Sequence, residues 1–135
     1  MYIENHVIKN FRNIEHIEIE PVNGINVIYG ENGHGKTNII ESIWLFTGCR
    51  SFRSVRDKDV VRFDCDEAKL KMEFFSGNRN KEAEIRIDEK RHITLNGIAL
   101  PSGRKMGQKC CRRWRSFCRG ARNCPRCWGS WLCTA

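Results

Sequence analysis

The segment "INVIYGENGHGKTNIIESIWLFTG" (25–48) constrains the fold more than any other part of this 135-residue chain. Its first six residues form a short apolar run, which is typical of a strand buried on both faces. A glycine-rich stretch follows, and then apolar residues recur at helical spacing until Gly48, where glycine favours a helix end. The segment therefore predicts a strand over 25–30, a loop, and a helix over 37–48.

The loop "GENGHGKT" (30–37) fits the pattern G-x-x-x-x-G-K-[ST]. Glycine at positions 30, 33 and 35 lets the backbone fold tightly, so that successive N–H groups can point at a polyphosphate. The N-terminus of the following helix adds unpaired donors and the positive end of its dipole. Lys36 is suited to reach β- and γ-phosphate oxygens, and the Thr37 hydroxyl is suited to coordinate Mg²⁺.

The predicted ATP-binding set is therefore the whole loop: Gly30, Glu31, Asn32, Gly33, His34, Gly35, Lys36 and Thr37. Thr37 is the predicted contact to the metal ion that accompanies the nucleotide. His34 occupies a variable position of the pattern, so we expect its imidazole to be exposed and not catalytic.

Alternating apolar and polar residues predict half-buried strands on both sides of this segment. The predicted strands lie at 2–9, 14–20, 69–75, 82–88 and 92–96, with hairpin turns at "SGNRN" and "DEKR". The pattern indicates an α/β fold: part of a nucleotide-binding core with an antiparallel β-rich layer attached. No stretch is long and apolar enough to predict a membrane span, and no signal peptide is evident.

The basic character of the chain is confined to its end. Residues 104–135 contain nine Lys or Arg and no Asp or Glu, whereas residues 1–103 have a formal charge of −1. Six of the eight cysteines and three of the four tryptophans also lie in this tail. We therefore divide the chain at 103/104, with an irregular tail after the division.

Three hypotheses explain the tail. It could be a zinc site built around Cys124 and Cys127, or a basic arm whose tryptophans stack on nucleic-acid bases. The third hypothesis, which we favour, is a displaced reading frame. Cys and Trp codons both begin with TG, and reading one base earlier turns each into a Leu, Met or Val codon. The tail would then have no function of its own.

The segments "MYIENHVIKNFRN", "GINVIYGENGHGKTN" and "SFRS" together resemble the amino terminus of the RecF family of bacterial recombination and repair ATPases. That resemblance implies the head fold of SMC and ABC ATPases, with ATP and Mg²⁺ as ligands. It also places Arg12 and Asn13 at the edge of the nucleotide. In this family it further implies a cytoplasmic homodimer that binds gapped or single-stranded DNA together with recombination mediator proteins.

Hydrolysis needs parts that the sequence does not supply. The family completes its site with a signature motif and an acidic pair after a further strand, and neither pattern occurs in residues 1–135. We therefore expect this chain to bind ATP without hydrolysing it above background. The alternatives are another SMC-like or ABC-type head, or a small cysteine-rich DNA-binding module.

Overall fold

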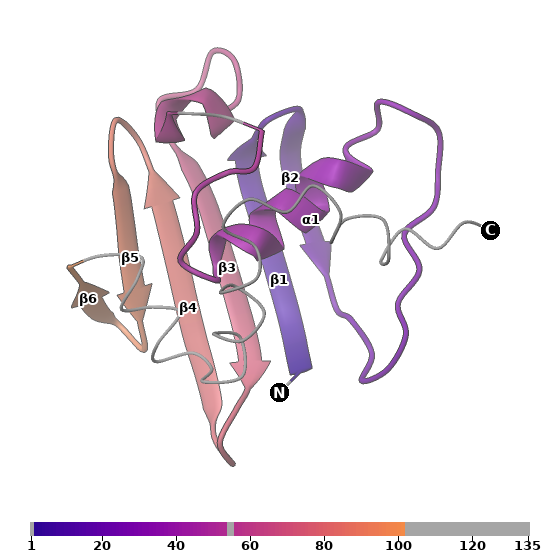
Figure 1. Ribbon diagram of the computed structural model, residues 1–135, viewed down its shortest axis with the longest axis vertical. Helices are drawn as coiled ribbons and strands as arrows, with labels where there is room; N and C mark the ends of the chain where they lie inside the picture. Colours follow the sequence, from indigo (N-terminus) through magenta and orange to yellow (C-terminus); the bar gives the residue numbers. More distant parts are fainter. Residues whose placement is uncertain (1, 54–55, 102–135) are drawn as a thin grey trace.

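The computed structural model describes residues 2–53 and 56–101, which form one antiparallel sheet covered by a single α-helix (Figure 1). In chain order the elements are β1 (Tyr2–Phe11), β2 (Ile14–Ile19), α1 (Lys36–Leu45), the short 3₁₀ helix η1 (Asp57–Val60), β3 (Ala68–Phe75), β4 (Asn80–Ile87), β5 (Arg91–Leu95) and β6 (Ile98–Leu100). The strands predicted around the central loop and the antiparallel β-rich layer are thereby confirmed.

The sheet has the strand order β2-β1-β3-β4-β5-β6, and every neighbouring pair is antiparallel. The strands from β3 onward form a meander. Its first turn is the predicted "SGNRN", where Gly77 and Asn78 both have positive φ. The chain between β2 and β3 crosses over one face of the sheet and contains the glycine-rich loop, α1 and η1.

The core lies between that face and the crossover. Alternate residues of β3 (Ala68, Leu70, Met72 and Phe74) are buried, as the period of two requires. Ile39, Leu45 and Phe46 join them from α1 and its C-terminal turn. The helix α1 ends at Leu45, three residues before the predicted end at 48, because residues 46–48 form a tighter turn that leads to Gly48 at φ 82°.

The strand predicted over 25–30 is not present. Residues 22–30 are exposed, with Ile25 at 91% and Tyr29 at 90%, and they form a wide excursion away from the sheet (Figure 1). Asn26 instead closes a local turn through hydrogen bonds of 2.9 Å to the N–H and carbonyl of Val22. A strand depends on neighbours that pair with its backbone, and no strand in the described part of the chain pairs with 25–30.

This exposed apolar segment leads to a prediction about self-association. Replacing both Ile25 and Val27 with Asp should lower the binding of a hydrophobic dye and the tendency of the protein to associate, because exposed apolar patches promote both. Ile98→Asp is the matched control, since Ile98 is 67% exposed at the far edge of the sheet. Dye fluorescence and light scattering measure the effect. A change no larger than that of the control would contradict the prediction.

Among the described residues, no helix has the length and apolar character needed to cross a membrane. The tail, and with it the zinc, basic-arm and displaced-frame hypotheses, lies outside the described residues. The division at 103/104 therefore stays a prediction.

Candidate functional site

The glycine-rich loop leads directly into α1. Gly33 and Gly35 have φ values of 90° and 87°, in the left-handed region that favours glycine. Gly35 is the N-cap of α1 and supplies no side chain to the free N–H groups of the first turn. The exposed loop therefore ends at a helix N-terminus that is suited to bind an anion.

The side chain of Lys36 folds back over the loop. Its Nζ donates hydrogen bonds to the carbonyl oxygens of Gly30 at 2.6 Å and Glu31 at 2.7 Å. An ammonium group has three donors, so one remains for a phosphate oxygen at this position. Thr37 follows as an exposed residue of the first helical turn.

The variable positions of the loop are exposed, as we expected for His34. His34 Nε2 lies 3.8 Å from Glu31 Oε2, and both side chains are largely in solvent. Asn32 is exposed between them. The structure thus brings the predicted residues 30–37 into one loop and helix start, in which Gly35 is buried, Lys36 is half-buried and the others are exposed.

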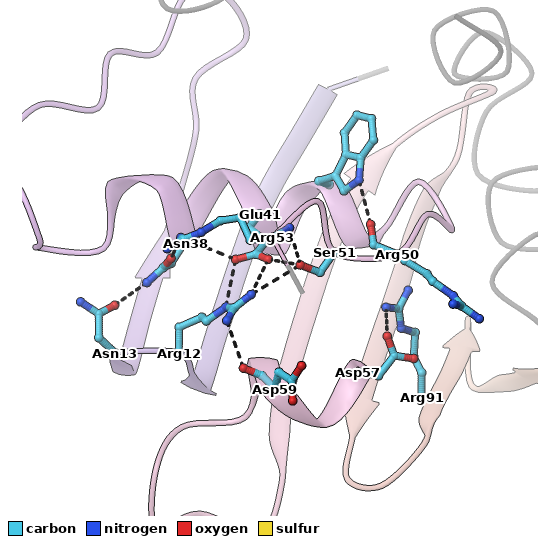
Figure 2. Close-up of polar contacts among 11 residues, drawn as sticks. Arg12, Asn13, Asn38, Glu41, Arg50, Ser51, Arg53, Asp57, Asp59 and Arg91 are labelled. Atoms are coloured by element: carbon cyan, nitrogen blue, oxygen red, sulfur yellow. Dashed lines mark hydrogen bonds and ion pairs between the residues drawn. The ribbon is translucent and has the colours of Figure 1, made fainter. Parts of the chain in front are cut away.

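Arg12 lies in the turn between β1 and β2, with φ 57°. Its guanidinium group binds the carboxylate of Glu41 in a bidentate manner, with Nε–Oε2 and Nη2–Oε1 distances of 3.1 and 2.9 Å (Figure 2). Its Nη1 donates to the carbonyl of Asp59 at 3.1 Å. The prediction that Arg12 lies at the nucleotide edge is untested, but the side chain is already engaged with α1.

Glu41 is the centre of a polar network that sequence reasoning missed. Its side chain is fully buried, and it accepts a short hydrogen bond from Ser51 in addition to those from Arg12. Arg53 Nη1 lies 3.9 Å from its Oε2. A signal was available, because helical periodicity places Glu41 on the same buried face as Leu45, and a carboxylate there needs a cationic partner.

Asn13 is the neighbour of Arg12 in the same turn, and it lies directly against the loop. Its Nδ2 donates to the carbonyl oxygen of Gly33 at 2.8 Å. The two residues expected at the nucleotide edge therefore point to different partners, Arg12 to Glu41 and Asn13 to the loop backbone.

A second buried polar contact joins α1 to the sheet away from the loop. His6 is completely buried, with its Nδ1 3.0 Å from the carbonyl oxygen of Lys71 and its Nε2 2.7 Å from Ser42 Oγ. Burial lowers the pKa of His6 to about 4, although the carbonyl of Lys71 opposes the shift. The folded protein thus keeps this imidazole neutral over most of the acidic range.

The lowered pKa of His6 predicts acid sensitivity. Below about pH 6.5 the unfolded chain protonates His6 while the folded protein does not, so stability falls as the pH drops toward 4. At pH 5 the loss should be about 2 kcal/mol. Urea unfolding at pH 7.5 and 5.0 should show this difference in the wild type and in His92→Gln, which alters an exposed histidine. The same pH dependence in His6→Gln would contradict the assignment.

Comparison with known proteins agrees with this geometry. A family profile described as an AAA domain matches residues 7–115, most of the chain. The chain belongs to this AAA domain family.

Within the described residues, no group of three or more His, Cys, Asp or Glu side chains is placed to hold a metal ion.

The relatives of this chain include DNA replication and repair proteins named RecF. The protein from Clostridium acetobutylicum is 38% identical over 102 residues, which cover 74% of this chain and 28% of that protein. The protein from Bacillus subtilis is 37% identical over 90 residues, covering 67% and 24%. The resemblance to RecF is confirmed, and the chain spans less than a third of the length of these relatives.

Solved structures of RecF and of an SMC head domain are also similar to this chain. The recombination mediator protein RecF with ATP, in the RecFOR pathway, has a TM-score of 0.72 at 30% identity, covering 78% of this chain and 30% of that one. An SMC head domain from Thermotoga maritima has a TM-score of 0.65 at 17% identity, covering 81% and 42%. The second likeness concerns the fold alone. Together they confirm the predicted fold class, the N-terminal part of an SMC-like or ABC-like ATPase head.

Proposed function

We propose that this chain binds ATP through residues 30–37 as part of a RecF-type protein of DNA replication and repair. The observation that carries the proposal is the position of Lys36. Its ammonium group lies over the glycine-rich loop at the start of α1, held by two loop carbonyls. The similarity to a RecF structure named with ATP supports the choice of ligand.

Each part of the loop has a role in this proposal. The loop N–H groups and the N-terminus of α1 receive the phosphates, and Lys36 compensates charge at the β and γ positions. The Thr37 hydroxyl coordinates Mg²⁺ bound to the nucleotide. These residues supply binding energy. Hydrolysis also requires a group that orients the attacking water, and we expect turnover no faster than background.

We propose gapped or single-stranded DNA, recombination mediator proteins and a second copy of the chain as partners, in the cytoplasm. The names of the relatives support DNA and mediator proteins in general terms.

Calorimetric titration with Mg·ATP, Mg·ADP and AMP tests the proposal. Because the loop recognises phosphates, affinity should fall in that order, with the largest loss when the β-phosphate is absent. Omitting Mg²⁺ should weaken ATP binding. Absence of ATP binding, or equal affinity for ATP and AMP, would contradict the proposal.

A further inference from the structure

We propose that Asn13 is a positioning residue that holds the phosphate-binding loop from beneath and sets the direction of one of its N–H groups. Asn13 touches the loop at two places. Its Nδ2 donates to the Gly33 carbonyl at 2.8 Å, and a Cβ added to Gly35 would lie 3.0 Å from its Oδ1. Gly35 therefore packs directly on the amide of Asn13, and the loop rests on this side chain.

The orientation of the Asn13 amide is fixed by a chain of three hydrogen bonds. Arg53 Nη1 donates to Asn38 Oδ1 at 2.6 Å, and Asn38 Nδ2 donates to Asn13 Oδ1 at 2.6 Å (Figure 2). An arginine has no acceptor, so the oxygen of Asn38 must face Arg53. Its NH₂ group then faces Asn13, which in turn presents its own NH₂ group to the loop.

The bond to Gly33 determines where the next N–H points. The Gly33–His34 peptide is trans, and in a trans peptide the C=O and the following N–H point in opposite directions. Since the Gly33 carbonyl is held against Asn13, the N–H of His34 is directed away from it, toward the exposed side of the loop. A carbonyl on that side would repel a phosphate, whereas an N–H binds it.

The burial of this hydrogen-bond chain supports a fixed orientation. Asn38 is only 8% exposed and belongs to the buried face of α1. Its own N–H is bound to the Gly35 carbonyl at 2.9 Å, so side chain and backbone of Asn38 are both fixed beside the loop. The inference rests on the proposed nucleotide binding and adds to it a role for a residue that need not touch the ligand.

Two variants separate the donor function of Asn13 from its packing. Asn13→Asp keeps the shape and the acceptor for Asn38 but removes the donor to Gly33. Asn38→Asp reverses the direction of these hydrogen bonds. A carboxylate at position 38 draws the NH₂ group of Asn13 toward itself, so the Asn13 amide oxygen turns toward the Gly33 carbonyl. Asn96→Ala is the matched control. The Oδ1 of Asn96 also makes a hydrogen bond with the backbone, because it accepts from the N–H of Glu82, but Asn96 lies in the turn between β5 and β6.

Two measurements are made on the full chain: Mg·ATP affinity by calorimetry, and ¹⁵N relaxation of the Gly33 and Gly35 amides without nucleotide. We expect both Asp variants to show greater loop mobility without nucleotide, where their added negative charge meets no phosphate, and to bind ATP at least about tenfold more weakly. Asn96→Ala should change neither quantity. Thermal unfolding of each variant serves as the control that the variant is folded.

Unchanged affinity and unchanged relaxation in Asn13→Asp would overturn the inference. If the wild type binds no ATP, the proposed function fails, and the relaxation data alone decide: greater mobility at Gly33 in both Asp variants supports the positioning role, and equal mobility overturns it.

Discussion

Lys36→Ala should lower the affinity for Mg·ATP by about a hundredfold or more while leaving the protein folded. Lys36 is the flexible cation of the loop, and its Nζ lies within 2.7 Å of the Gly30 and Glu31 carbonyls. Charge-assisted hydrogen bonds to phosphate are about twice as strong as neutral ones, and alanine leaves the phosphate charge uncompensated. Calorimetry measures the loss.

Two further variants make this result specific. Lys36→Arg keeps the charge, but a planar guanidinium does not reproduce the compact ammonium between two carbonyls, so binding should also weaken. Lys9→Ala removes an exposed cation from β1 and should bind ATP as the wild type does. Equal affinity in the wild type and in Lys36→Ala would show that the loop does not bind the phosphates.

Glu41→Ala should destabilise the fold by about 3–5 kcal/mol, the range for breaking a buried ion pair by removing one partner. Glu41 is fully buried and binds the Arg12 guanidinium through both carboxylate oxygens, in addition to Ser51. Its loss removes the carboxylate that binds both Nε and Nη2 of Arg12, in a turn where φ of Arg12 is 57°. Glu41→Gln should fall between the wild type and alanine, since it keeps the volume and one acceptor.

An exposed ion pair provides the control for Glu41. Glu15 pairs with Arg62 at 3.0 Å, but its side chain is 75% exposed. Glu15→Ala should therefore cost less than about 1 kcal/mol. Urea unfolding of both variants measures the difference. Equal losses would mean that the network around Glu41 does not stabilise the fold.

The sequence predicted those elements whose stability depends on local patterns. Alternation in "KLKMEFF" corresponds to β3, which lies within the sheet and buries one face against α1. The glycine-rich loop and the helix after it were also predicted, because glycine spacing and helical periodicity are properties of the segment itself.

The features that the sequence predicted wrongly or did not reveal depend on contacts between residues far apart in the chain. The apolar run at 25–30 has the composition of a buried strand, but strand formation requires partners elsewhere in the chain. The pairing of Arg12 with Glu41 joins residues 29 positions apart, and β6 is only three residues long, too short to show alternation. Helical periodicity indicates that Glu41 is buried and needs a cation, but it does not indicate which residue supplies that cation.

Nucleotide binding at residues 30–37 is tested most directly by a ¹H–¹⁵N NMR titration of the wild-type protein with Mg·ATP, which shows where the nucleotide binds. We expect saturable shifts concentrated at the backbone amides from Gly33 to Thr37 and at the start of α1, and their loss in Lys36→Ala. Saturable shifts centred elsewhere, for example on β4 and β5, or no shifts at millimolar ATP, would contradict the assignment of this loop as the nucleotide site.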